Sequence, residues 1–379
     1  MPAWKVPLAD VIVTEDDLAA VTETYRSGWL SMGPRTEEFE ARFASYTGAR
    51  HAFAVTNGTA ALHLACMVAG IGPGDEVICP SMTFVASANA IRYCGATVVF
   101  ADIAGLAEPW LSAERVETAI TPRTKAIMAV DYGGHSGEIA ALERLARERG
   151  LVLLEDAAHA AGSRLDGRHL GTFAHVGAFS FFSNKNLAVG EGGMVVTDDD
   201  EAAARLRLLR SHGMTTLTWD RHRGHASGYD VVDLGFNYRI DEPRAAFATR
   251  RLERLDDENA ARGRLDARYR ELLEPLGVTC ALPAADGLQS AHHLFAVVLD
   301  EGADRDAFRA LLAERGVQTS VHYPPVHGFS IYADGAPELP LTEAYGMRAV
   351  TLPLFAHMTR DQQDLVVEAV GAALAGVAA

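Results

Sequence analysis

Lys185 is the side chain in this sequence whose surroundings best suit covalent chemistry. Of the 34 basic residues, only Lys5, Lys125 and Lys185 are lysines, and a lysine amine can lose its proton and attack a carbonyl, whereas arginine retains its charge. Lys185 lies in GAFSFFSNKNLAVGEGG, among aromatic and small residues with no neighbouring acid. Desolvation there would lower the pKa of the amine. A lone lysine is usually a solvated surface charge, but this setting favours a reactive amine.

A carboxylate follows another apolar run. In LVLLEDAAHA, Glu155 and Asp156 end a leucine-rich strand, at the edge of a sheet where ligands gather. A carboxylate there can pair with a protonated pyridine nitrogen, so that the ring can absorb the electrons of a carbanion. His159 is placed to touch the same ring. Asp156 is equally well explained as the N-cap of a helix over AAHAAG, and the sequence leaves both interpretations open.

The motif NGTAAL at 57–62 follows the run HAFAV and opens an apolar helix. Gly58 and Thr59 there expose backbone amides at the positive end of a helix dipole, which is a natural seat for a phosphate. The motif lacks the lysine of a P-loop and the third glycine of a dinucleotide fingerprint. Plain helix capping therefore explains it as well as phosphate binding does.

Phe84 lies in PSMTFVAS at 80–87, again at a strand end. An aromatic ring there can stack on a flat cofactor, worth about 1 kcal/mol beyond its burial, or it can simply pack in the core. Each of these motifs is weak alone. Together they indicate a site, because a parallel sheet brings such strand ends to the one edge where a ligand would lie.

The elements that must position these residues alternate between about residues 50 and 200. The predicted strands are 51–55, 75–80, 96–102, 125–131, 151–156, 177–182 and 193–198, and the predicted helices between several of them are 59–70, 84–95 and 138–150. Strands joined by helical crossovers predict an α/β fold with a mainly parallel central sheet flanked by helices.

A smaller α+β unit is expected at the C-terminal end. A helix over 198–212 precedes one long helix from Asp241 to about Leu273, whose first turn Pro243 suits. After it, the pattern predicts strands at 291–300 and 317–323 and helices at 305–316 and 361–376. We expect a large domain over 1–250 and a small domain over 251–379.

The composition excludes several classes of protein. A net charge of −16 argues against a sequence-independent nucleic-acid binder, which needs a basic surface. No apolar run approaches the roughly 20 residues of a membrane-spanning helix, and the N-terminal segment lacks the features of a signal peptide. We therefore expect a cytoplasmic protein. His222 and His225 suggest no metal site, because no cysteine or second pair completes it.

The chain resembles the nucleotide-sugar aminotransferases of the DegT/StrS type, which are pyridoxal 5'-phosphate (PLP) enzymes of fold type I. The resemblance is nearly full-length and rests on ordered motifs, including GPRTEEFEARFASYTGARHAFAVTNGTAALHLA, GPGDEVICPSMTFVASANAI, EDAAHAAGS, GAFSFFSNKNLAVGEGGMVVTDD, GFNYRIDEPRAAF, VHYPP and TLPLF. It implies a PLP-binding large domain and cycling of the cofactor between PLP and its amine form, PMP.

The resemblance also implies roles for single residues. Lys185 would hold PLP as a Schiff base and carry the proton, and Asp156 would bind the pyridine nitrogen. His159 would contact the phenolic side of the ring, and Phe84 would stack on it. The phosphate would be held by Gly58, Thr59, Ser180 and, from the neighbouring subunit of a homodimer, Asn237. Contacts with the nucleotide sugar would come from Trp219, Arg223, Tyr229, Arg239, His322 and Tyr323, although a solvated loop explains the first three equally well.

The activity implied is transfer of an amino group from an amino acid, by family habit L-glutamate, to a nucleotide-linked keto-sugar. A dTDP-4-keto-6-deoxyhexose in deoxyaminosugar and antibiotic biosynthesis is the substrate we expect, and a 3-keto-sugar is the alternative. Some relatives are PMP-dependent sugar dehydratases with histidine in place of the lysine, and Lys185 argues against that activity. A non-catalytic regulator on the same scaffold is the remaining alternative.

Overall fold

A seven-stranded sheet forms the centre of the computed structural model, which describes residues 4–216 and 228–377. Its strands, in the spatial order β1-β9-β8-β5-β4-β2-β3, are β1 His51–Val55, β9 Gly193–Thr197, β8 Val176–Ser180, β5 Val152–Asp156, β4 Thr124–Val130, β2 Glu76–Pro80 and β3 Thr97–Ala101. β9 runs antiparallel to both β8 and β1, and the other pairs are parallel. The predicted α/β sheet is confirmed, and each strand lies within two residues of its predicted range.

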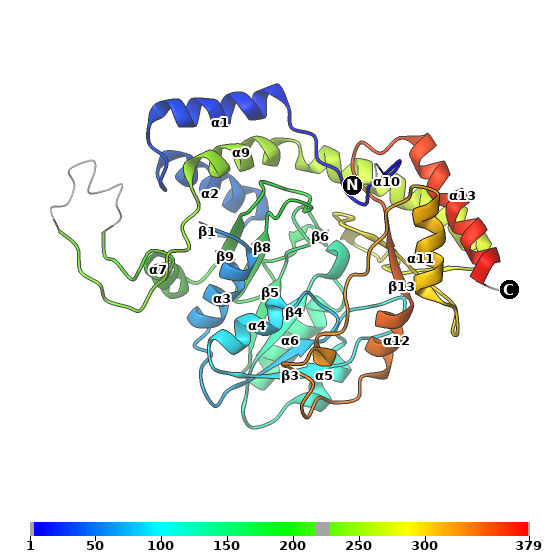
Figure 1. Ribbon diagram of the computed structural model, residues 1–379. Helices are drawn as coiled ribbons and strands as arrows, with labels where there is room; N and C mark the ends of the chain where they lie inside the picture. The colour runs from blue at the N-terminus through cyan, green and yellow to red at the C-terminus, as the bar shows by residue number, and fades with distance from the viewer. Residues whose placement is uncertain (1–3, 217–227, 378–379) are drawn as a thin grey trace.

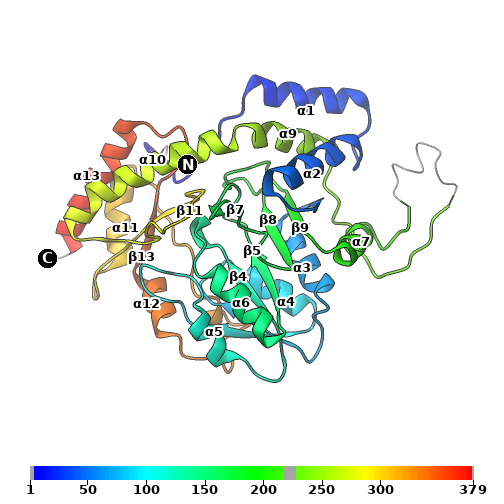
Figure 2. The ribbon, with the colours of Figure 1, turned by 180° about the vertical axis from the view of Figure 1, so that it is seen from behind.

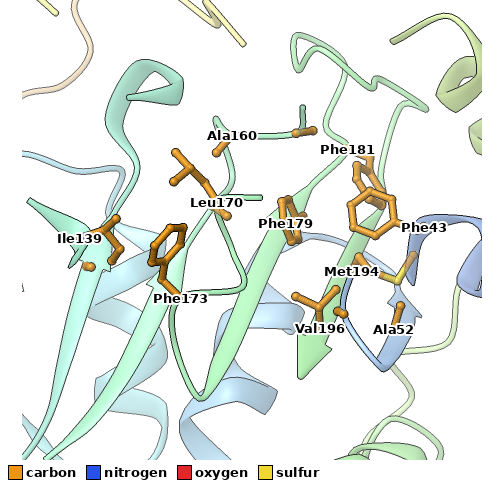
Figure 3. Packing of buried hydrophobic residues seen from close by; sticks show 14 of the residues in the cluster. Phe43, Ala52, Ile139, Ala160, Leu170, Phe173, Phe179, Phe181, Met194 and Val196 are labelled. Carbon is orange, nitrogen blue, oxygen red and sulfur yellow. The ribbon is translucent and has the colours of Figure 1, made fainter. Parts of the chain in front are cut away.

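Helices cover both faces of this sheet (Figures 1 and 2). One face carries α3 Gly58–Val68, α4 Ala86–Tyr93 and α7 Asp200–Leu209, and the other carries α2 Pro34–Thr47, α5 Ala113–Ala119 and α6 Ile139–Arg149. Because each strand is buried on both sides, the strands read as nearly continuous apolar runs. Figure 3 shows the second face, where Phe43 packs edge-on against Phe179 and Phe181 at ring-centroid distances of 5.0 and 5.5 Å.

The helix predicted from Asp241 to Leu273 is two helices, α9 Glu242–Glu253 and α10 Leu255–Leu273. They meet at Arg254, whose φ of −114° and ψ of 5° depart from helical values. The side chain of Arg254 binds Asp17 of α1 (Glu15–Ser27), which lies along α9, and Glu258 one turn further on. The prediction of one helix was wrong because the ion pair that holds the junction joins distant parts of the sequence.

The C-terminal part of the chain builds a second, smaller sheet from β10 Thr279–Cys280, β12 Phe295–Val298 and β13 Ala349–Leu352. The helices around it are α11 Arg305–Glu314, α12 Pro340–Arg348 and α13 Arg360–Val377. The predicted strand at 317–323 was wrong, because this segment makes only single bridges, Val317 with Val6 and Ser320 with Thr351. Val6, near the N-terminus, thereby packs in the apolar cluster of the C-terminal part. The domain boundary near residue 250 stays a prediction.

Short elements complete the described chain. A small sheet contains β6 Arg164–Leu165, β7 Arg168–His169 and β11 Leu288–Gln289, and the 3-10 turns are Tyr132–Gly134, Glu274–Leu276 and Val326–Gly328. Within the described ranges, the helices are all too short or too polar to cross a bilayer.

Candidate active site

A cavity of about 830 Å³ opens where β1, β2, β5 and β8 end. The strand directions explain its position, because β1, β2, β5 and β8 all point the same way and so present their carboxyl ends at one edge. Of the residues predicted for the site, those that line this cavity are Gly58, Thr59, Phe84, Asp156, His159, Ser180, Lys185, His322 and Tyr323.

Lys185 is held in the cavity by the loop that follows β8. Its backbone N–H donates to the carbonyl of Phe182 at 2.8 Å, and the next residue, Asn186, is buried. The amide of Asn186 donates to Asn259 and to the carbonyl of Ala291, each at 2.7 Å. Burial lowers the pKa of Lys185 to about 8, and the charge of Asp156 opposes that shift. An appreciable share of the amine is therefore neutral near physiological pH.

Asp156 ends β5 as a buried carboxylate with two fixed hydrogen bonds. Its Oδ1 accepts from the backbone N–H of Ala158 at 3.1 Å, and its Oδ2 accepts from Oγ of Ser87 at 2.6 Å. Burial raises the pKa of Asp156, while these two hydrogen bonds and the charge of Lys185 lower it. The interpretation of Asp156 as a helix N-cap is wrong, because residues 157–162 form turns and no helix follows.

Ser87 is a site residue that the sequence analysis missed. It lies on α4, completely buried, and its hydroxyl also interacts with Thr83 at 2.8 Å. The motif PSMTFVAS ends at this serine, so the signal was present. Only the fold shows that it contacts a carboxylate 69 positions away.

The N-terminus of α3 forms a cradle for an anion beside Ser180. Asn57 caps the helix by accepting from the N–H of Ala60 at 2.8 Å. Among the described residues, the amides of Gly58 and Thr59 have no acceptor, and both residues line the cavity. A Cβ at Gly58 would lie 2.7 Å from the Cβ of Ser180, so glycine is required for this close approach. Capping and phosphate binding, posed as alternatives from the sequence, are thus compatible.

Neutral imidazoles surround the lysine. The backbone N–H of Gly133 donates to Nδ1 of His159 at 3.1 Å, which leaves Nε2 as the protonated nitrogen that donates to the hydroxyl of Tyr323 at 3.0 Å. Burial, with the charge of Lys185, holds the pKa of His159 well below its usual range and lowers that of His322 to about 4. His293, which the sequence analysis missed, packs 4.2 Å from His159, and its pKa is lowered for the same reasons.

The remaining predicted residues lie outside the lining of this cavity or outside the described residues. Asn237 and Tyr229 are exposed, and Arg239 donates to Ser211 at 3.1 Å. Trp219 and Arg223 fall in 217–227, which is not described. The cavity wall instead includes residues that the sequence analysis did not select, His63, Tyr93 and Tyr238. His63 and Tyr238 contact each other, Nδ1 to hydroxyl, at 3.1 Å.

These residues fit PLP. The Lys185 amine, whose pKa is lowered, suits a covalent bond to an aldehyde. Asp156 suits a pyridinium nitrogen, and free amides at a helix N-terminus suit a phosphate. Phe84, 54% exposed in the open cavity, offers a ring face for stacking and lies 5.6 Å from Tyr323. Across the described ranges, no group of three or more His, Cys, Asp or Glu side chains could hold a metal ion.

Comparison with known proteins agrees with this chemistry. The chain matches the DegT/DnrJ/EryC1/StrS aminotransferase family over residues 11–371. The spore coat polysaccharide biosynthesis protein SpsC of Bacillus subtilis is 40% identical over 377 residues, which cover 96% of each chain. The aminotransferase TlmJ of Streptoalloteichus hindustanus superimposes with a TM-score of 0.93 at 36% identity, over 99% of this chain and 100% of that one.

A second solved structure, DesV of S. venezuelae, has a TM-score of 0.87 at 40% identity and covers 94% of this chain and 93% of its own. Solved relatives also include a PLP form and a PMP form of one aminotransferase. The chain therefore belongs to the DegT/DnrJ/EryC1/StrS aminotransferase family and is a PLP-dependent aminotransferase of fold type I.

Proposed function

We propose that this enzyme transfers the amino group of L-glutamate to a keto-sugar carried by a nucleoside diphosphate, with a dTDP-4-keto-6-deoxyhexose as acceptor in deoxyaminosugar biosynthesis. The observation that carries the proposal is the Lys185 amine, whose pKa is lowered to about 8, in one cavity with the buried carboxylate of Asp156. About 830 Å³ leaves room for a substrate beside the cofactor. A solved relative, CalS13 of Micromonospora echinospora, is named a sugar aminotransferase, which supports a sugar as the acceptor.

Some side chains of the site would bind the cofactor, and Lys185 would transfer the proton. When bound, PLP supplies an electron sink for the carbanion formed at the substrate carbon. Asp156 keeps the pyridine nitrogen protonated, and the hydroxyl of Ser87 holds the carboxylate in place. With the cofactor bound, Lys185 would be the positioned general acid and base that delivers the proton to the sugar carbon. His159 and His322 stay neutral, so they add no positive charge that would compete for Asp156.

The acceptor would lie against the aromatic side of the cavity. Phe84, Phe182 and Tyr93 are exposed there, at 54%, 44% and 56% of their surfaces. Exposed aromatic side chains suit the apolar face of a hexose and the flat base of a nucleotide. Tyr323, whose hydroxyl accepts from His159, retains its own proton because burial raises its pKa. It can therefore donate to a sugar oxygen.

A homodimer would complete each site. Asn237 is exposed and lies outside the cavity lining of its own chain, and its segment carries exposed apolar side chains, Val231, Val232 and Leu234, the last 83% exposed. Contiguous exposed apolar residues mark interaction surfaces. Burial of this segment against a second copy would bring Asn237 toward the phosphate cradle of the partner.

A substrate screen tests this function. The purified holoenzyme is incubated with L-glutamate and each of a set of dTDP- and UDP-linked 4-keto and 3-keto sugars, and 2-oxoglutarate release is followed. We expect release with a dTDP-4-keto-6-deoxyhexose and none without a keto-sugar. Release only with 3-keto-sugars would replace the acceptor, and no bleaching of the cofactor absorbance by glutamate would overturn the donor.

A further inference from the structure

A second cavity of about 300 Å³ lies apart from the active site, at the junction of α9 and α10. It is lined by residues of the N-terminal segment 10–12, of the two helices, and of the segment before α13. On the helices these are Arg251, Arg254, Asp257, Glu258, Ala261 and Arg262, and before α13 they are Ala356 and His357. None of these residues lines the cavity that holds Lys185. The proposed function assigns this cavity no role.

Arg262 is the unusual group in this cavity. Its side chain is only 6% exposed, yet its guanidinium makes a single long hydrogen bond, from Nη1 to Oδ1 of Asn259 at 3.4 Å. Among the described residues, no carboxylate lies within 4 Å of it. A buried cation without a counterion is costly, and the burial is reflected in a pKa lowered to about 10, at which the group is still charged near neutral pH.

The other two arginines of the cavity contact carboxylates, whereas Asp257 in its lining has no ion-pair partner among the described residues. Arg251 binds Glu258 at 3.0 Å, Arg254 binds Asp17 and Glu258, and His357 binds Asp10 at 3.0 Å. Arg262 is thus the one arginine of this cavity, within the described ranges, whose charge is not matched by a contacting acid. A single negative charge would neutralise it.

The shape of the guanidinium and the acids in the lining favour one kind of anion. A guanidinium has a planar pair of N–H groups that matches a carboxylate with two parallel hydrogen bonds. Asp257 and Asp10, both exposed, also line the cavity and would repel a group with two negative charges more strongly than a group with one. A ligand with one carboxylate and a small body of carbon atoms suits both the charge and the volume.

Arg262 is joined to the catalytic loop by buried amides. Oδ1 of Asn259 accepts both from Arg262 and from Nδ2 of Asn186, the residue after Lys185. Arg251, on the same cavity wall, donates to the carbonyl of Asn186 at 3.3 Å, and its Nε is buried without a partner. The floor of the second cavity therefore lies directly behind the loop that holds the lysine.

We propose that Arg262 forms the base of a binding site for a small monocarboxylate, distinct from the active site and separated from Lys185 by the amides of Asn259 and Asn186. The carboxylate pairs with the free N–H groups of Arg262, and the carbon body lies against the aliphatic side chains of Val11, Ile12 and Ala261. Binding needs no covalent step.

The test is isothermal titration calorimetry on the holoenzyme with cyclopentanecarboxylate, which has no amine or ketone and so is not a transaminase substrate. We expect saturable binding in the millimolar range to the wild-type protein. Arg262→Gln should weaken it by about tenfold or more, because the charged pair is lost. Arg264→Gln, on the exposed side of the same helix, is the matched control and should bind as the wild type does.

A second variant keeps the test decisive if Arg262→Gln unfolds. Ala356→Glu places an acid in the lining of the cavity and leaves Arg262 in place, so it should also abolish binding of the carboxylate. Absence of saturable binding to the wild type, or binding by Arg262→Gln and Ala356→Glu that is as tight as that of the wild type, would overturn the site. Tighter binding of inorganic phosphate than of the carboxylate, lost in the same variants, would overturn the ligand class. None of these outcomes depends on which keto-sugar the enzyme uses.

Discussion

The hydroxyl of Ser87 on α4 donates a 2.6 Å hydrogen bond to Oδ2 of Asp156 at the end of β5. This contact stabilises the ionised form of a carboxyl whose pKa burial raises. The ionised form is the one that can hold a pyridinium nitrogen. The two residues therefore act as a unit, in which α4 supplies the orientation and β5 supplies the charge.

Ser87→Ala removes that hydrogen bond and leaves a buried carboxylate oxygen without its donor. Loss of a hydrogen bond to a charged group costs about 1.5–3 kcal/mol, so we expect kcat to fall by about tenfold or more and cofactor affinity to weaken. Ser87→Thr, which retains the hydroxyl, should recover much of both. The measurements are steady-state kinetics and cofactor titration, with KM for the sugar as an internal control that stays near its wild-type value. An unchanged kcat in Ser87→Ala would remove the role assigned to Ser87.

Replacement of Lys185 tests the central assignment. Lys185→Ala and Lys185→Arg remove the amine that can be deprotonated, so both should lose the absorbance of lysine-bound cofactor and turnover. Lys125→Ala, at an exposed position of β4, is the control and should keep both. Spectra of the purified proteins before and after addition of glutamate provide the readout. Full transaminase activity in Lys185→Ala would refute the assignment.

The lowered pKa of Lys185 predicts how the apoenzyme takes up PLP as pH changes. Only the neutral amine attacks the aldehyde, and with a pKa of about 8 its fraction rises about tenfold from pH 6 to 7 and levels off above pH 8. The rate of reconstitution, followed by absorbance after mixing apoenzyme with PLP, should follow this curve. Asp156→Asn removes the charge that raises the pKa, so its midpoint should move to lower pH. A rate that does not change between pH 6 and 9 would contradict a titrating lysine.

Gly58→Ala probes the phosphate cradle. The added Cβ would lie 2.7 Å from the Cβ of Ser180, so α3 or β8 must shift, and the amides that face the phosphate would shift too. We expect PLP affinity to fall by about tenfold or more, since overpacking of this kind costs about 1–3 kcal/mol. Gly72→Ala is the matched control, because nothing lies within 4 Å of its new Cβ. Equal PLP affinities in the two variants, measured by fluorescence titration, would show that the close approach at Gly58 is not needed.

Local sequence patterns predicted the central sheet and those site residues that lie at or just after the ends of its strands. The strands that end at Val55, Asp156 and Ser180 are apolar runs bounded by polar or small residues, and such a run needs no distant partner to be recognised. Asp156 could be selected because it ends such a strand, and Lys185 because it lies shortly after one. Parallel pairing then brings them to one edge without further information.

Contacts between distant segments could not be predicted in this way. Ser87 became a site residue only when α4 was packed over β5, and His293 only when the C-terminal unit was docked beside Asn186, 107 positions away. The break at Arg254 depends on Asp17, 237 positions earlier. In each case the feature depends on an interaction between distant side chains. The local sequence around each side chain is equally typical of an ordinary surface or core residue, so it gives no sign of that interaction.

A mixing experiment tests whether Asn237 serves the partner's site. In a heterodimer of a Lys185→Ala chain and an Asn237→Ala chain, the second chain keeps its lysine and receives Asn237 from the first, so one site is intact and the other carries both defects. If the chains pair randomly, half of the dimers are mixed and about a quarter of wild-type activity should return on co-expression of two impaired variants. If Asn237 instead serves its own chain, every lysine-containing site in the mixture carries the Asn237→Ala defect. Activity would then stay at the average of the two parents, and the shared site would be ruled out.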